Sequence, residues 1–212
     1  MLTEARALFY LGRTQDAMAA ADAALARARA LDHDTLIAQT LALRGYLEVA
    51  APEPDAPKGV SLLQEACARF TGLGDRIGLM TAMNLLGDAQ MALGDFPAAH
   101  AIMDATRALA YELGTKDDET FAWINLALAG AELGDLAAAR AAAAKAEALA
   151  AELGSKFTSG LAAAIAATLA ALAGEPGGAE ARIDEALGVA QAIKSKYMEL
   201  LVRRQQAETR LH

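Results

Sequence analysis

The sequence is poor in the residues that carry most protein chemistry. It has one cysteine, three histidines and an aromatic content of 5%. Cys67 cannot form an intramolecular disulfide, and its place on an apolar helix face predicts a buried structural thiol. His33, His100 and His212 are spaced too irregularly to bring two imidazoles onto one metal ion. We therefore predict a chain without a disulfide or a metal site, in keeping with a cytoplasmic location.

An excess of basic charge and long apolar runs are also lacking. The chain has 27 acidic and 19 basic residues, a formal net charge of −8, which would repel a nucleic-acid backbone. The N-terminal segment has no basic region followed by an apolar stretch. No uninterrupted apolar run reaches the roughly 18 residues that a membrane helix needs. Direct binding to nucleic acid or to a membrane is not expected.

Motifs for catalysis are missing as well. The chain has no phosphate loop, no GxGxxG, no CxxC pair and no Ser-His-Asp arrangement. Asp117, Asp118 and Glu119 form an acidic run at an expected helix start, where the helix dipole favours negative charge, so capping explains them. The sequence predicts no enzymatic activity and no cofactor.

What the chain does have is alanine and a repeating pattern. Apolar residues make up 55% of the sequence and many are alanine, the strongest helix former, which favours an all-α protein. Two series of residues recur every forty positions. A period of that length with two punctuation points per unit is typical of a solenoid of paired helices. The series are Gly94, Gly134 and Gly174, and Leu73, Leu113, Leu153 and Ile193.

The pattern predicts five helix pairs in one domain over 1–212, followed by an unpaired capping helix. Repeat units are expected at 1–34, 35–75, 76–116, 117–155 and 156–195, with the cap at 196–212. Pro52, Pro54 and Pro57 interrupt the second unit and predict the longest connection, in the loop 51–59. The expected helices are 3–11, 14–31, 35–49, 58–70, 76–93, 96–113, 119–133, 136–153, 156–173, 177–193 and 196–211. Helix caps are expected at Thr14 to Asp16, Asp75, Asp117 or Asp118, and Ser155.

Residue types around the recurring glycines resemble the tetratricopeptide repeat (TPR) family. Small residues stand seven positions before each glycine and five and twelve positions after it, where that family packs its helices closely. Leu86, Leu126, Trp123 and Phe96 match its larger packing positions, so Trp123 is expected to be a core anchor. Gln90 and Gly130 replace a usual tyrosine, and Pro176 a usual aromatic. The small residues are Gly87, Ala127, Ala167, Ala99, Ala139, Ala179, Thr106, Ala146 and Ala186.

The resemblance implies a right-handed superhelical solenoid whose first helices line a concave groove for a peptide or partner helix. The forty-residue period is similar to the repeat regions of bacterial signal-responsive transcriptional regulators. Two interpretations therefore stay open: a non-catalytic protein-protein interaction module, or a regulatory segment of a larger regulator that self-associates, for example as a homodimer. The residues projected into the groove are Gln39, Tyr46, Thr81, Asn84, Asp88, Met91, Phe121, Ile124, Asn125, Leu128, Leu161, Ala164 and Thr168.

Overall fold

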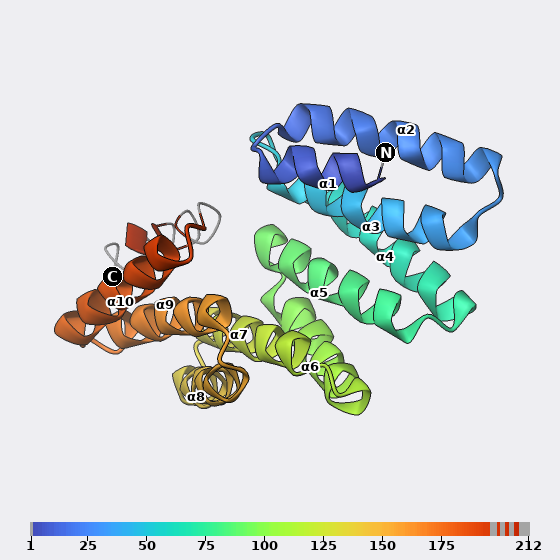
Figure 1. Ribbon diagram of the computed structural model, residues 1–212. Coiled ribbons are helices and arrows are strands. Elements are labelled where there is room, and N and C mark those ends of the chain that lie inside the picture. The colour runs from blue at the N-terminus through green and yellow to red at the C-terminus, as the bar shows by residue number, and fades with distance from the viewer. Residues whose placement is uncertain (1, 196–198, 200–201, 204–205, 208–212) are drawn as a thin grey trace. The chain divides into compact units, whose positions relative to one another are not determined.

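A computed structural model describes residues 2–195 together with 199, 202, 203, 206 and 207 (Figure 1). Over the described residues the chain is all-α, with ten helices in sequence and no strand. None of these helices combines the length and apolar character that crossing a membrane requires. The helices are α1 (Leu2–Tyr10), α2 (Thr14–Ala30), α3 (Asp34–Ala50), α4 (Ala56–Leu73), α5 (Arg76–Leu93), α6 (Phe96–Leu113), α7 (Lys116–Glu132), α8 (Leu136–Leu153), α9 (Lys156–Leu172) and α10 (Pro176–Ala192).

The recurring Gly-Asp pairs both end one helix and begin the next. Gly94 has a φ of 81°, the left-handed conformation that favours glycine, and its N–H donates to the Met91 carbonyl at 3.1 Å. The Asp95 N–H then donates to the Gln90 carbonyl at 3.0 Å, and its carboxylate accepts from the Ala98 N–H at 3.1 Å. The two residues Gly94 and Asp95 thus provide hydrogen bonds for backbone groups at the end of α5 and at the start of α6.

Several expected helix starts are confirmed and others are wrong. Asp75 and Ser155 accept from the backbone N–H groups of Gly78 and Thr158, as predicted. The predicted caps of α2 and α7 are wrong, because these helices follow Arg13 and Thr115, neither of which makes a side-chain cap. Each helix therefore starts before the predicted acidic cap, and Asp16, Asp117 and Asp118 lie in the first turn. There the helix dipole still favours their charge.

The helix after the proline-rich loop also begins earlier than expected. It starts at Ala56 rather than Lys58, because Pro57 occupies the first turn, where a missing N–H costs no hydrogen bond. Asp55 caps it by accepting from the Lys58 N–H at 3.0 Å. The same residue donates its own N–H to the Glu48 carbonyl at 3.0 Å. Both ends of the loop are thus held by local hydrogen bonds.

The chain divides into two compact units, residues 1–102 and 103–212. In the first unit α3 packs against α1, α2, α4 and α5, and α4 packs against α5. The largest buried cluster joins Ile37 and Leu41 of α3 to Leu63 and Phe70 of α4 and Leu86 of α5. The odd-numbered helices therefore contact one another as well as their sequence neighbours.

Two glycines bring α3 and α4 unusually close. A Cβ added to Gly45 would lie 2.8 Å from Leu63 Cγ and 2.9 Å from the Gly59 carbonyl oxygen. A Cβ on Gly59 would lie 2.6 Å from Val49 Cγ2 and 2.8 Å from the Gly45 carbonyl oxygen. Both glycines are buried. The contact between these helices is therefore backbone against backbone and has no room for a methyl group.

Beside this contact lies a network of four charged side chains from three helices. Arg44 of α3, 9% exposed, places Nε 2.7 Å from Asp22 Oδ1 of α2 and Nη1 2.6 Å from Glu48 Oε1. Glu48, 6% exposed, is also 2.5 Å from Lys58 Nζ of α4. The Arg44–Glu48 contact is an ion pair without hydrogen-bond geometry. The nearly buried charges of Arg44 and Glu48 thus pair with each other and with the half-exposed charges of Asp22 and Lys58.

In the second unit α7 packs against α8 and α9, and α9 packs against α10. Its core is made largely of alanine, with Met103, Ile124, Ile165 and Leu169 among the larger residues. The predicted capping helix 196–211 lies mostly outside the described residues. Of its described members, Val202 is fully buried in a cluster with residues of α9 and α10.

Cys67 packs as a structural thiol but is half-buried rather than buried as predicted. It is half-buried and packs against the first-unit core, and burial raises the pKa of its thiol from 9.0 to about 11. The thiolate that reacts with disulfide reagents is therefore scarce in the folded protein at neutral pH.

We predict that the free energy of unfolding decreases between about pH 9 and about pH 11 in a Cys67-dependent manner. The thiol of the unfolded chain ionises first in this range, so deprotonation favours unfolding, whereas below it the thiol is protonated in both states. Denaturant unfolding of wild type and Cys67→Ala at pH 8 and pH 10.5 measures the effect. An identical pH dependence in both proteins would rule out the raised pKa.

Candidate functional site

The strongest candidate surface of the second unit lies on α7 and α9. Phe121, Asn125 and Leu128 are spaced i, i+4 and i+7 along α7, so they share one face of that helix. Phe157 and Leu161 share a face of α9 in the same way. The rings of Phe121 and Phe157 lie 6.1 Å apart between centroids at an interplanar angle of 49°. We call these five residues the α7–α9 face.

All five residues of the α7–α9 face are half-buried, so part of each side chain packs against protein and part remains open to solvent. Leu128 and Leu161 pack against the core of the second unit, and Phe157 against the neighbouring cluster with α10. Asn125 points its amide at Met103 Sδ, with Nδ2 at 3.7 Å. The face is therefore apolar, anchored to the core, and carries one amide near its centre.

Three residues predicted to line the groove belong to the core instead, which corrects the sequence projection. Ile124 is 2% exposed and Ala164 is 1% exposed, and both are members of buried clusters. Thr168 is 7% exposed and its hydroxyl donates to the Ala164 carbonyl at 3.4 Å. A neighbouring position on a helix is rotated by about 100°, so a small error in the projected face exchanges core and surface.

Phe157 is a residue of the face that the sequence projection missed. It stands four positions before Leu161, which the projection did include, and so belongs to the same stripe of α9. That spacing was available in the sequence. Its contact with Phe121 was not, because the two rings come from helices separated by α8.

The candidates of the first unit are placed on α3 and α5. Gln39 and Tyr46 of α3 are half-buried, and the Tyr46 ring meets Phe9 of α1 edge to face at 5.3 Å between centroids. On α5, Thr81 is exposed and its hydroxyl donates to the Ile77 carbonyl at 3.1 Å. The remaining three candidates of α5 are half-buried: Asn84, Asp88 and Met91.

One of these candidates, Asn84, has a side-chain oxygen that accepts no hydrogen bond from the described residues. Asn84 Oδ1 is buried and forms no hydrogen bond with the part of the chain that the structure describes. A buried carbonyl oxygen of this kind is normally paired with protein or water, and its burial keeps it out of reach of a molecule bound at the surface. Gln90 Oε1, also on α5, is likewise buried and accepts no hydrogen bond from the described residues, and Gln90 as a whole is only 7% exposed.

Trp123 has a mixed role rather than that of a fully enclosed anchor. Its half-buried ring packs against the core of the second unit. The Arg107 guanidinium carbon lies 5.0 Å from the ring centroid, a cation–π arrangement, and the indole N–H donates to Glu119 Oε1 at 3.3 Å. These contacts join α6 to α7. The ring and the indole N–H of Trp123 are therefore both engaged by residues of the second unit.

The acidic run at the start of α7 lies in the turn before Phe121. Burial raises the pKa of the Asp118 carboxyl, the Thr115 hydrogen bond opposes that rise, and the charge of Asp117 adds to it. Within the described residues no three His, Cys, Asp or Glu side chains are placed to share a metal ion. The first turns of α7 and α9 thus carry charges of both signs, because Lys116 begins α7 and Lys156 stands directly before Phe157.

No protein-family model matches the sequence, and no curated protein matches it significantly. Solved structures do match the fold. A crystal structure of the Podosopora anserina protein described as a kinesin light chain with nearly identical TPR-like repeats has 15% identity and a TM-score of 0.68, covering 92% of this chain and 94% of that one. A variant of the same protein gives 15% identity and a TM-score of 0.70, with coverages of 91% and 94%. BtubC (BKLC) from P. vanneervenii is 17% identical with a TM-score of 0.70, covering 93% of this chain and 85% of that one.

Proposed function

We propose that this chain, which has the all-α fold of TPR-like repeat proteins, is a non-catalytic interaction module that binds an apolar peptide or helix of a partner protein. The α7–α9 face is the proposed binding surface. The observation that carries the proposal is the half-buried Phe121–Phe157 pair, continued by Leu128 and Leu161 on the same two helices. Aromatic side chains held in this way are the usual anchors of protein interfaces.

The geometry favours binding with little ordering cost. Phe157, Leu128 and Leu161 are already packed against buried clusters, so a partner does not have to immobilise them. The Asn125 amide gives the face a polar group that can orient a peptide backbone. With a net charge of −8 and an acidic first turn of α7, a partner with a basic edge would associate faster at low salt.

We predict that the double variant Phe121→Ala, Asn125→Ala loses partner binding while its melting temperature changes little. Removing an interface aromatic costs about 2 kcal/mol or more of binding free energy, or at least roughly a 30-fold loss of affinity. Affinity capture from a lysate of the source organism, with proteins identified by mass, measures the effect. Titration calorimetry with the purified captured protein then gives the affinities.

Tyr111→Ala is the matched control, since it removes an aromatic ring that is 72% exposed on α6, a helix that contributes no residue to the α7–α9 face. A partner that binds wild type and Tyr111→Ala and not the double variant supports the proposal. Equal capture by all three proteins would place the working surface elsewhere. The narrower interpretation, a self-associating segment of a bacterial regulator, stays a prediction, and light scattering at high protein concentration tests its self-association.

A further inference from the structure

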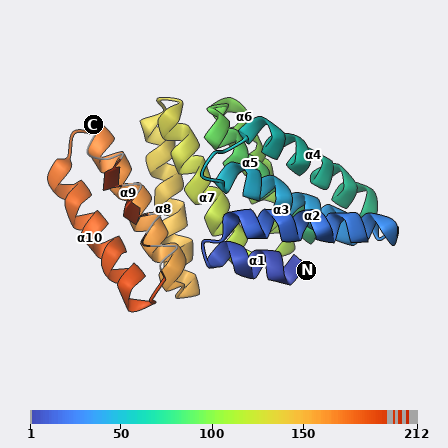
Figure 2. The same cartoon turned by 90° about the horizontal axis from the view of Figure 1, so that it is seen from above.

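The buried residues of α8 are all alanine, whereas its neighbours α7 and α9 bury larger side chains such as Ile124 and Ile165. α8 packs against both of these helices (Figure 2). Leu136 in its first turn is half-buried and contacts the same core. A methyl group buries less apolar area and interlocks less with its neighbours than a leucine or isoleucine side chain. Apolar packing therefore holds α8 less firmly than α7 or α9. The buried residues are Ala139, Ala142, Ala143, Ala146 and Ala150.

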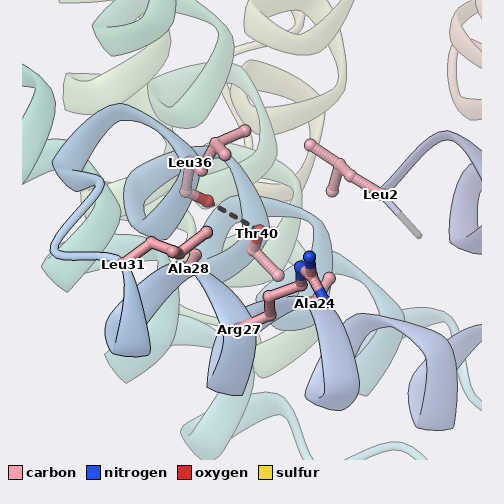
Figure 3. Close-up of a pocket in the computed structure, with 7 residues that line it drawn as sticks. All are labelled: Leu2, Ala24, Arg27, Ala28, Leu31, Leu36 and Thr40. Carbon is pink, nitrogen blue, oxygen red and sulfur yellow. Dashed lines mark hydrogen bonds between the residues drawn. The ribbon is translucent and has the colours of Figure 1, made fainter.

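Alanine side chains also reach only a short distance across the space between two helices. Figure 3 shows such a place in the first unit, a pocket of about 220 Å³ beside Arg27, whose lining includes Ala24 and Ala28 of α2. The position of a helix that buries only alanine thus depends on contacts other than its apolar face.

Two ion pairs between α8 and α10 are contacts of this kind. Arg140 Nη2 lies 2.8 Å from Oε1 of Glu175, the residue directly before α10, and Glu147 Oε1 lies 2.5 Å from Arg182 Nη1. α8 supplies the cation of the first pair and the anion of the second. A shift of α10 along α8 by seven residues would set Arg140 against Arg182, and like charges repel. The two pairs therefore favour one position of α10 beside α8.

A third ion pair joins the other end of α8 to α7. Glu152 in the last turn of α8 pairs with Lys116, the first residue of α7. The side chains of the three pairs are between 38% and 59% exposed. Dissolved ions reach all of them, so their attraction weakens as the salt concentration rises.

We propose that α8 is a salt-sensitive support of the α7–α9 face, positioned by its three ion pairs more than by apolar contacts. Leu128 and Leu161 of the face pack against the core cluster to which α8 contributes four alanines. When the ion pairs weaken, α8 opens locally more often, and the face loses part of the core on which it packs. The inference rests on the proposed function in one respect, that the α7–α9 face is a binding surface.

The test follows amide hydrogen exchange of α8 in the full chain by NMR, in about 0.1 M and about 1 M sodium chloride. Between these concentrations the screening length falls from about 10 Å to about 3 Å. Wild-type α8 amides should exchange faster in the higher salt. The nuclear Overhauser effect between the rings of Phe121 and Phe157 should weaken in parallel, because it reports the geometry of the face without any partner.

Arg140→Gln should accelerate α8 exchange about two- to five-fold in the lower salt, the range for loss of one exposed ion pair. Lys145→Gln is the matched control, since it removes the same charge from an exposed position of α8 that belongs to none of the three pairs. It should leave the exchange rates unchanged.

The triple variant Arg140→Gln, Glu147→Gln, Glu152→Gln separates screening of the ion pairs from other effects of salt. Its α8 amides should exchange rapidly at both salt concentrations. The proposal is overturned if this variant and wild type respond equally to salt, or if Lys145→Gln acts like Arg140→Gln. It is equally overturned if the Phe121–Phe157 ring contact stays unchanged while α8 exchange accelerates.

Failure of this inference and failure of the proposed function are distinguishable, because the exchange and ring measurements use no partner. Normal partner binding by the Phe121→Ala, Asn125→Ala variant would overturn the proposed function alone. A partner that is lost by that variant, and whose binding to wild type is equally tight in both salt concentrations and in the triple variant, would overturn the supporting role of α8 alone.

Discussion

Gly45→Ala is expected to lower the free energy of unfolding of the α3–α4 pair by about 2 kcal/mol. A methyl group there would meet Leu63 Cγ at 2.8 Å and the Gly59 carbonyl oxygen at 2.9 Å. Overpacking a tight core contact costs about 1–3 kcal/mol, and two contacts this short argue for the upper end. The gain in helix propensity of about 1 kcal/mol offsets part of that cost. The helices must separate, since the second contact is with backbone that has no rotamer to change.

Gly72→Ala is the matched control for this substitution. Gly72 is exposed near the end of α4, and a Cβ added there has nothing within 4 Å. Only the helix-propensity term applies, so this variant should be unchanged or more stable by up to about 1 kcal/mol. The two substitutions are therefore expected to act in opposite directions.

Hydrogen exchange of the α3 and α4 amides is the appropriate measurement, because repeat arrays need not unfold in a single step. Faster exchange in both helices of Gly45→Ala, and not in α9, is the expected result. Unchanged protection in α3 and α4 would contradict the close approach of these helices. It would mean that the pair can spread by a few tenths of an ångström without cost.

Arg44→Leu is expected to destabilise the first unit by about 3 kcal/mol. Removing one partner of a buried pair leaves an uncompensated charge, which costs about 3–5 kcal/mol. Glu48, 6% exposed, would lose Arg44 but keep Lys58, whose side chain is 52% exposed, so the cost falls at the lower end. The double variant Arg44→Leu, Glu48→Leu removes both buried charges. It should recover most of the lost stability, since apolar replacements of a buried ion pair are often neutral.

Arg13→Leu separates burial from simple ion pairing. Arg13 Nε lies 2.7 Å from Asp16 Oδ2, the same separation as between Arg44 Nε and Asp22 Oδ1, but the Arg13 side chain is 61% exposed. An exposed pair contributes at most about 1 kcal/mol, so this variant should be nearly as stable as wild type. Urea unfolding followed by circular dichroism compares the four proteins. Equal losses for Arg13→Leu and Arg44→Leu would show that burial of the network is not what matters.

The helices and their turns could be predicted from the sequence because their causes are local. A glycine with positive φ followed by an aspartate ends one helix and caps the next with contacts spanning only a few residues, as at Gly94 and Asp95. Alanine content and the forty-residue period then indicate paired helices with little further information. Where an error arose, as at α4, it concerned one turn of helix and a proline whose tolerance at that position is itself local.

Part of the candidate site could be predicted in the same way. Phe121, Asn125 and Leu128 share a helix stripe that is visible in the sequence, and all three are half-buried on α7. Ile124 was misplaced because the direction of the core depends on how α7 is rotated against α8 and α9. That rotation is set by packing between helices rather than by the pattern along one of them.

The sequence by itself thus determined the kind and approximate ends of the ten helices between Leu2 and Ala192, since backbone propensity and turn chemistry act over a few residues. Only the tertiary structure decided which residues meet. The contact of Phe121 with Phe157, the backbone approach at Gly45 and Gly59, and the pocket beside Arg27 all join separate helices. Such contacts depend on the rotation, spacing and relative length of packed helices, which no single helix encodes.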